Sequence, residues 1–124
     1  MVTYNEYLKK ILVQILDSYK ILKEIKDNPG DLDNIKKEML KINGFLKVIS
    51  HKIDIDKIPA SNFKTLKLKF QNYLENYYFE KEIETMAPLY SNDVNRVKNM
   101  RLKILEALEN KKMMDEIEEL IEKI

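Results

Sequence analysis

The residues best suited to chemistry in this chain are His51, its single histidine, and Asp54 and Asp56, which follow closely. An imidazole beside two carboxylates could act as a general base or help to hold a metal ion. Zinc, however, prefers four ligands that are usually histidine or cysteine, and the chain has no cysteine. A loop histidine near aspartates is more often simply solvated. The sequence therefore predicts no metal site and no cofactor.

Other catalytic patterns are also missing from the sequence. Gly30 and Gly44 stand alone, so they cannot form a glycine-rich phosphate loop. A Ser-His-Asp arrangement would have to use His51, and there is no nucleophile elbow. The Glu-x-x-His pattern of metal sites inside four-helix bundles is absent as well. We expect no catalytic residues and a protein that is not an enzyme.

Arg101 is the sharpest polar signal in the sequence. Twenty of the 22 basic residues are lysines, and both arginines, Arg96 and Arg101, lie in the stretch NRVKNMRLKIL. Read as a helix, this stretch places Arg101 on an apolar stripe with Val94, Val97, Ile104 and Leu108. A guanidinium there needs a carboxylate partner, because its desolvation is costly otherwise. The partner belongs either to another subunit or to the preceding helix, at Glu75, Glu80 or Glu84.

An aromatic cluster lies in the stretch NYLENYYFEKE, where Tyr73, Tyr77, Tyr78 and Phe79 fall within seven residues. Tyr73 and Tyr77 lie on the expected core stripe, whereas Tyr78 and Phe79 point partly away from it. Tyrosine and phenylalanine are enriched in the cores of protein interfaces. The alternative is a broad face buried inside the bundle. We predict a protein interface at Tyr77, Tyr78, Phe79 and Arg101.

Basic residues gather in two stretches, over 64–69 and 96–103. Nucleic acid could bind them if the two helices pack together and their basic side chains line one groove. The net charge of +1 provides no global attraction, and residues 113–124 hold five acids against one base, a net charge of −4. An ordinary solvated face is the alternative. Nucleic-acid contact is therefore a second hypothesis, assigned to Lys64, Lys67, Lys69, Arg96, Lys98 and Lys103.

Helices have to position all of these side chains. A chain of 124 residues with 44% hydrophobic content is about one domain, and its two glycines and three prolines are too few for a sandwich or barrel. Apolar residues at helical spacing predict a helical hairpin over 4–50 that turns at Pro29-Gly30. A connector over 51–60 follows, and Ala87-Pro88 breaks or kinks the chain after the next helix. We predict an all-α, single-domain antiparallel bundle of four to five helices, the last three over 62–86, 93–110 and 112–123.

Nothing in the sequence points to a membrane. No apolar run approaches the roughly 18 residues of a membrane span. The N-terminal stretch MVTYNEYLKK lacks a basic region followed by an apolar signal core. We therefore expect a cytoplasmic protein.

The C-terminal half resembles a known family of helical proteins. The stretches RLKILEAL and MMDEIEELIEKI, and IPASNFKTLKLKFQNYL before them, are similar to the helical domain of archaeal GINS replication subunits. The resemblance covers roughly residues 59–124. It implies a non-enzymatic replisome scaffold that bridges helicase components through helical faces, and it assigns no role to an individual residue. The small β-rich domain usual in GINS subunits has no strand pattern here.

These observations favour a non-catalytic helical interaction protein, a subunit or adaptor of a larger assembly, with a link to DNA replication through the GINS resemblance. Its partner would be a protein, in a homo-oligomer or a hetero-complex. One alternative is a nucleic-acid-contacting small subunit of a ribonucleoprotein complex. Another is a small viral or plasmid-encoded inhibitor that docks on a host complex.

Overall fold

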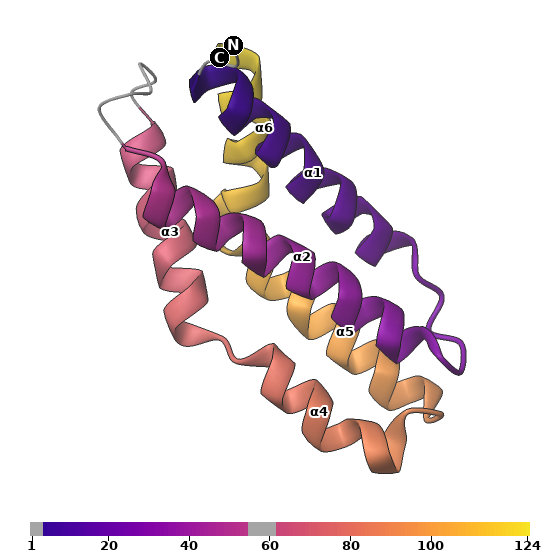
Figure 1. The fold of residues 1–124 in the computed structure, drawn as a ribbon. Helices are drawn as coiled ribbons and strands as arrows, with labels where there is room; N and C mark the ends of the chain where they lie inside the picture. Colours follow the sequence, from indigo (N-terminus) through magenta and orange to yellow (C-terminus); the bar gives the residue numbers. More distant parts are fainter. Residues whose placement is uncertain (1–3, 55–61) are drawn as a thin grey trace.

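The computed structural model describes residues 4–54 and 62–124, and every regular element in these ranges is helical (Figure 1). The predicted all-α fold is therefore confirmed for the described residues. The helices are α1 (Tyr4–Glu24), α2 (Asp31–Lys52), α3 (Phe63–Asn76), α4 (Phe79–Tyr90), α5 (Val94–Glu109) and α6 (Met113–Lys123), with a 3-10 turn, η2 (Asn110–Lys112), before α6.

Helices α1 and α2 form an antiparallel hairpin over the range where the sequence predicts one (Figure 1). Gly30 ends the connection with φ of 94°, a left-handed conformation that glycine adopts without steric cost. The facing side chains are fully or almost fully buried, and each such leucine or isoleucine contributes about 1.5–3 kcal/mol to stability. They are Leu8, Ile11, Leu12, Ile15 and Leu22 on α1, and Leu32, Ile35, Met39, Ile42, Leu46 and Ile49 on α2.

Helices α3, α5 and α6 contribute most of the remaining core residues around this hairpin. α3 packs on α2 and α6, and α6 packs on α1, α3 and α5. α3 contributes the buried side chains of Phe63, Leu66, Phe70 and Tyr73. The connector predicted over 51–60 is helical at its start, because α2 continues to Lys52, and Ile53 is buried beyond it. The rest of that connector lies outside the described residues.

The single helix predicted over 62–86 is wrong, because the chain bends at Tyr77 and Tyr78 between α3 and α4. Tyr77 is extended, with φ of −124° and ψ of 131°. In a continuous helix, residues 77 and 79 would point about 200° apart. The bend lets Tyr77 stack on Phe79, with ring centroids 5.3 Å apart, while Phe79 enters the core at 2% exposure.

The break predicted at Ala87-Pro88 is also wrong, because α4 continues through Pro88 to Tyr90. A proline inside a helix removes one backbone hydrogen bond, here the bond to the carbonyl of Glu84. Glu84 is exposed, so water can take the place of the missing donor. A proline near the end of a surface helix therefore costs less than one in its buried interior.

Helix α5 runs antiparallel to α4 after a tight turn (Figure 1). The carboxylate of Asp93 caps α5 by accepting a hydrogen bond of 3.2 Å from the amide of Arg96. At the other end, Lys111 and Lys112 have positive φ of 56° and 59°, which separates α5 from α6. The bounds of α5 and α6 lie within one residue of the predicted helices over 93–110 and 112–123.

Candidate protein-binding groove

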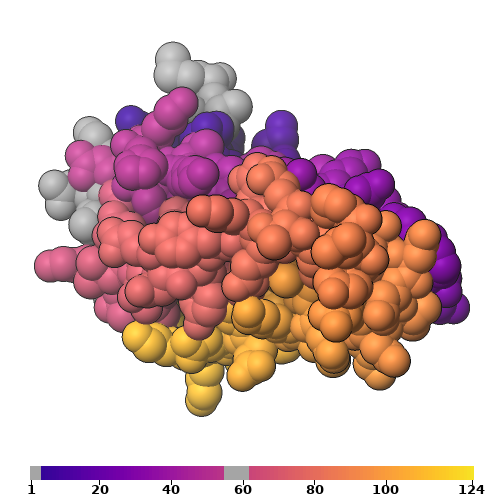
Figure 2. Space-filling view, turned by 90° about the horizontal axis from the view of Figure 1, so that it is seen from below, coloured from indigo at the N-terminus to yellow at the C-terminus, as the bar shows by residue number. Residues whose placement is uncertain are grey.

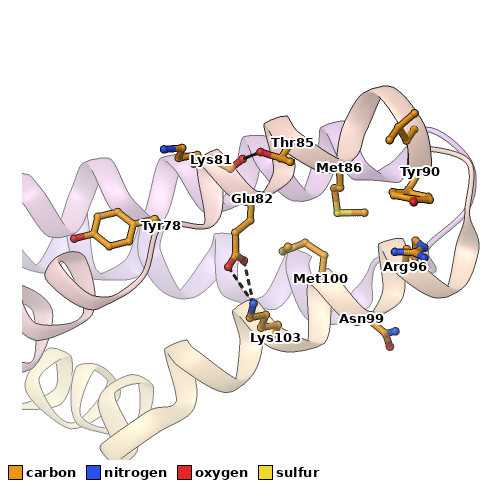
Figure 3. A pocket seen from close by; sticks show the side chains of 11 residues that line it. Tyr78, Lys81, Glu82, Thr85, Met86, Tyr90, Arg96, Asn99, Met100 and Lys103 are labelled. Carbon is orange, nitrogen blue, oxygen red and sulfur yellow. Dashed lines mark hydrogen bonds and ion pairs between the residues drawn. The ribbon is translucent and has the colours of Figure 1, made fainter.

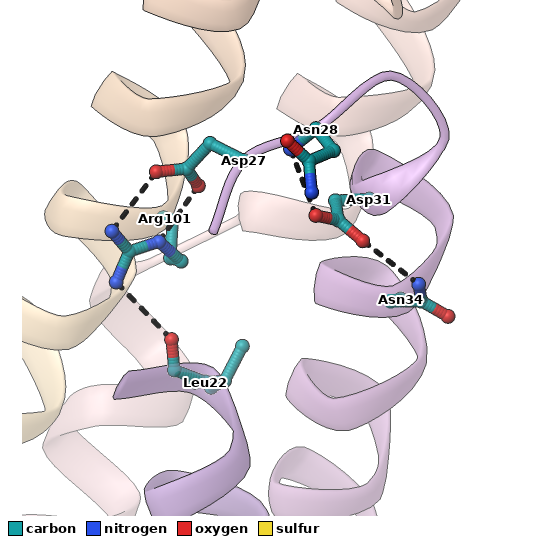
Figure 4. Close-up of polar contacts among 6 residues, drawn as sticks. All are labelled: Leu22, Asp27, Asn28, Asp31, Asn34 and Arg101. Atoms are coloured by element: carbon teal, nitrogen blue, oxygen red, sulfur yellow. Dashed lines mark hydrogen bonds and ion pairs between the residues drawn. The ribbon is translucent and has the colours of Figure 1, made fainter. Parts of the chain in front are cut away.

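Arg101 finds its partner inside the chain, at Asp27 in the loop between α1 and α2 (Figure 4). Its Nε donates to Asp27 Oδ1 at 2.7 Å and its Nη2 donates to Oδ2 at 3.0 Å. Nη1 also donates to the carbonyl of Leu22 at 3.2 Å. The hydrogen bond to Asp27 raises the pKa of Arg101 further above its ordinary value. The expected partners on the preceding helix, Glu75, Glu80 and Glu84, are therefore wrong.

The pair of Arg101 and Asp27 is shielded from water, since their side chains are only 11% and 6% exposed. All three hydrogen bonds of the guanidinium go to the hairpin and its loop. Arg101 therefore joins α5 to the α1–α2 hairpin. This position argues against the predicted direct interface contact by Arg101, because its charge is already satisfied inside the chain.

The predicted aromatic interface is divided between the core and the surface. Phe79 is 2% exposed, so its assignment to an interface is wrong: the bend before α4 turns it inward. Tyr77 is half-buried and lies between the rings of Tyr73 and Phe79, at 5.5 and 5.3 Å. Tyr78 is 69% exposed and remains available to a partner.

The two basic stretches do not line one groove. Lys67 donates to the carbonyl of Ile53 at 2.8 Å. Lys69 donates to the carbonyl of Lys111 at 2.8 Å and pairs with Glu116 on α6. These contacts hold the α3 lysines toward α2 and α6. Of the predicted helix over 62–86, only the part that forms α4 packs beside α5, whereas α3, which carries Lys64, Lys67 and Lys69, packs on α2 and α6.

The remaining basic candidates differ in how they are engaged. Arg96 lies 3.6 Å from Asp93 and its guanidinium covers the ring of Tyr90 at 3.8 Å. Lys103 pairs with Glu82 at 3.1 Å. Lys64 and Lys98 are exposed. Lys67 and Lys69 are thus separated from Arg96 and Lys103, which border α4, and this weakens the case for one phosphate-binding surface.

A groove of about 660 Å³ lies between α4 and α5. Figure 2 shows this face of the molecule, with the orange atoms of α4 and α5 beside the yellow atoms of α6. The groove has a largely apolar lining with charged groups at its edges. Its lining residues are Tyr78, Lys81, Glu82, Thr85, Met86, Leu89, Tyr90, Arg96, Asn99, Met100 and Lys103.

Two polar contacts cross the groove near its ends, and methionines face each other between them (Figure 3). Glu82 and Lys103 form an ion pair toward the Tyr78 end. Arg96 stacks on Tyr90 at the opposite end. Met86 and Met100 point toward one another between these pairs. Along α4, Glu82, Met86 and Tyr90 are spaced four positions apart. Along α5, Arg96, Met100 and Lys103 are spaced four and three positions apart. This spacing is that of the contact seam in an antiparallel helix pair.

Apolar side chains at the groove remain open to solvent. Leu89 is 77% exposed and Tyr78 is 69% exposed, although both lie on or beside a helix of the bundle. α4 buries Phe79 and Ile83 and packs Met86 and Ala87 partly against the core, whereas Leu89 is directed to solvent. The sequence predicts Tyr78 as an interface residue but gives no such indication for Met86, Leu89 and Met100. Because Ala87-Pro88 predicts a break or a kink, the sequence assigns no helical position to Leu89.

The described residues show no other site with recognisable chemistry. No group of three His, Cys, Asp or Glu residues among them could hold a metal ion. His51 is exposed at the end of α2, and Asp56 lies outside the described residues. No helix in the described part of the chain is both long and apolar enough to cross a membrane.

Comparisons with protein-family models, curated proteins and solved structures find no match to this chain. The similarity of residues 59–124 to GINS subunits therefore stays a prediction from sequence.

Proposed function

We propose that this chain is a non-catalytic interaction protein, a subunit or adaptor of a larger assembly, and that a protein partner docks in the groove between α4 and α5. The observation that carries the proposal is the exposure of Leu89 and Tyr78 beside the half-buried Met86. Contiguous exposed apolar surface rimmed by polar residues is typical of protein interaction sites.

Exposure alone does not distinguish this groove from the rest of the surface. Leu68 on α3 is 58% exposed, and single exposed apolar residues are ordinary. Leu89 and Tyr78 differ because they border a groove between α4 and α5 with a volume of about 660 Å³. A partner side chain can be surrounded there, which is how the central residues of protein interfaces gain most of their energy.

The polar groups of the groove support docking over catalysis. Glu82 and Lys103 neutralise one another, and Arg96 is engaged by Asp93 and Tyr90. The hydroxyl of Thr85 donates to the carbonyl of Lys81 at 2.9 Å, one turn back on α4. A general acid or base has to lie within hydrogen-bond reach of a substrate proton, directly or through one water, and these groups are already engaged within the chain. The setting in DNA replication rests on the GINS resemblance alone and forms part of the same proposal.

Affinity capture from a lysate of the source cells, with quantitative mass spectrometry, tests this function. Wild-type protein, Leu89→Ser and Leu68→Ser serve as baits, the last as a matched control with an exposed leucine on α3. We expect a partner that is retained by wild type and Leu68→Ser and lost with Leu89→Ser. Binding of the same partner should then be reproduced with purified proteins.

Two results would contradict the proposal. One is a full set of partners that Leu89→Ser retains as well as wild type does. The other is the recovery of nucleic acid in place of protein, with binding that falls steeply as salt is raised, as phosphate contacts require.

A further inference from the structure

We infer that the occupant of the α4–α5 groove is an amphipathic helix of a partner protein that carries acidic residues along its flanks. This inference rests on the proposed docking function and specifies the chemistry of the partner.

The walls of the groove favour a helix as the occupant. Both walls are helices, with groove-lining residues at intervals of three and four, and such ridges accept the side chains of a third helix. The described residues contain no strand, so they offer no sheet edge to which an extended peptide could add. Tyr78 and Tyr90 are twelve positions apart, roughly 18 Å along a helix. That length accommodates about three turns of a partner helix with apolar anchors at i, i+4 and i+7.

The methionine pair makes the floor of the groove adaptable. Met86 is half-buried and Met100 is 9% exposed, and they face one another across the seam. Methionine is unbranched and flexible, so it can move aside and then pack around an inserted apolar side chain. A pair of branched residues in the same place would resist that change, because their rotamers are more restricted. Leu89 and Tyr78 then cover the inserted side chains from the rim.

The charges at the rim select an acidic partner. Lys81, Arg96 and Lys103 line the groove with Glu82, and Asp93 pairs with Arg96 beside it, so these five charges sum to +1. Glu82 is already paired with Lys103, and the side chain of Lys81 has no polar partner among the described residues. The side chains of Arg96 and Lys103 remain 55% and 57% exposed, so both can still meet an incoming carboxylate. Complementary charge of this kind speeds association and rejects partners of the same sign.

Other occupants fit this surface less well. A small ligand usually needs a few convergent polar groups, whereas Glu82 and the hydroxyl of Thr85 are used within the chain. A nucleic-acid base needs an open aromatic face, and the guanidinium of Arg96 already covers one face of Tyr90 at 3.8 Å. A helix that combines apolar anchors with carboxylates uses both the methionine floor and the basic rim.

A displayed peptide library tests this inference with the full-length chain as bait. The peptides keep leucine or methionine at anchor positions i, i+4 and i+7, and their flanking positions are randomised between glutamate and lysine. A second library, of extended peptides with alternating apolar residues, competes in the same selection. We expect helical peptides with glutamate-rich flanks to be enriched, and the enrichment to be lost on Leu89→Ser.

The selected peptide is then labelled and its Kd measured by fluorescence anisotropy. Lys81→Glu should weaken binding about tenfold, because it reverses a charge at the rim. Lys9→Glu is the matched control, since Lys9 is an exposed lysine on α1 outside the groove, and it should leave the Kd within about twofold. Circular dichroism of both variants establishes that they are folded.

The outcomes separate this inference from the proposed function. Leu89-dependent enrichment of lysine-flanked or extended peptides overturns the acidic helix but leaves the groove as a protein-docking site. Equal loss of affinity for Lys81→Glu and Lys9→Glu also overturns it. If neither the peptide selection nor the capture experiment depends on Leu89, both the inference and the proposed function are wrong.

Discussion

The α1–α2 hairpin and the α4–α5 pair are both antiparallel helix pairs, but their seams are built differently. Between α1 and α2 most facing residues are leucines and isoleucines at or close to zero exposure, and the buried hydroxyl of Ser18 donates to the carboxylate of Glu38 across the seam. Between α4 and α5 the facing residues are an ion pair, two methionines and a cation–π pair. The first seam is closed along most of its length, with a smaller pocket of about 330 Å³ beside Tyr7 and Phe45. The second leaves an open groove of about 660 Å³.

This difference indicates how stability and recognition are divided within the molecule. The β-branched isoleucines and γ-branched leucines that interlock in the core supply stability through burial. Once buried, these side chains are out of reach of a partner protein. Methionines and surface ion pairs supply less, since an exposed ion pair contributes about 0–1 kcal/mol. The α4–α5 pair therefore depends on the rest of the bundle for its position and keeps its apolar surface available.

The largest expected effect comes from breaking the contact that joins the two regions. Arg101→Met leaves the carboxylate of Asp27 buried without its cation, which should cost about 3–5 kcal/mol of unfolding free energy. Urea denaturation at neutral pH measures it. Arg96→Met is the control, because the side chain of Arg96 is 55% exposed, and it should change stability by less than about 1 kcal/mol. Equal effects from the two variants would show that the Arg101 pair has no special role.

The next prediction compares the seams themselves. Leu46→Ala on α2 removes a side chain with no exposure and should destabilise the protein by about 2–5 kcal/mol. Met86→Ala on α4 removes a half-buried side chain beside open space and should cost less than about 1 kcal/mol. Thermal and urea unfolding of both variants give the comparison. A cost for Met86→Ala as large as that for Leu46→Ala would mean that the second seam is also a structural core.

The smallest effect concerns Tyr73, which lies on α3 just before the bend that leads to α4. Its side chain is 4% exposed and its hydroxyl has no hydrogen-bond partner among the described residues. Tyr73→Phe removes an unsatisfied buried group, so it should raise stability by about 1 kcal/mol. Chemical denaturation at pH 7 measures this gain, and a loss of stability would indicate that the hydroxyl does have a partner.

We expect the same variant to change how stability depends on pH. Burial raises the pKa of Tyr73 above its ordinary value of about 10. The folded state then holds the phenolic proton more tightly than the unfolded state does. This contribution to stability is complete below about pH 10 and is lost as pH rises further. Tyr73→Phe should therefore show a shallower fall in stability than wild type above pH 10, and parallel curves would contradict the assignment.

Tyr19 provides an internal comparison for that measurement. Burial, together with the neighbouring Glu109, raises the pKa of Tyr19 to about 12. The contribution of the Tyr19 hydroxyl to folding stability is likewise present below about pH 10 and lost as pH rises toward 12. The double variant Tyr19→Phe/Tyr73→Phe should thus remove more of the alkaline fall than either change alone.

Helical periodicity was enough to predict most of the fold. The apolar stripes of α1 and α2 repeat at three- and four-residue spacing, and Pro29-Gly30 marks the turn between them. These are local signals, because spacing and turn residues act on neighbouring positions. The bend at Tyr77 and Tyr78 carries no glycine or proline, so it has no local signal. It arises because Phe79 enters a core that other helices build.

The candidate site was harder to predict, for the same reason. Arg101 was identified as a residue that needs a carboxylate, since a charge on an apolar stripe is a local anomaly. Its partner Asp27 lies 74 positions away in a loop, with φ of 63°, and no helical pattern points to it. Likewise the exposure of Leu89 depends on how α4 sits against α5. Only Tyr78 of the groove was predicted as an interface residue.

The bend at Tyr77 and Tyr78 also has a consequence for motion. α5 buries six side chains and is joined to the hairpin through Arg101. α4 buries only two, its ion pair to α2 between Glu84 and Lys36 is partly exposed, and non-helical residues lie at both of its ends. Local opening should therefore begin at α4, and its amides should exchange with solvent at a lower free energy than those of α2. We expect α4 to pivot about the bend while α5 stays in place. The width of the groove then changes with the rotation of α4 about the bend. A partner that binds the widened form would restrict that rotation.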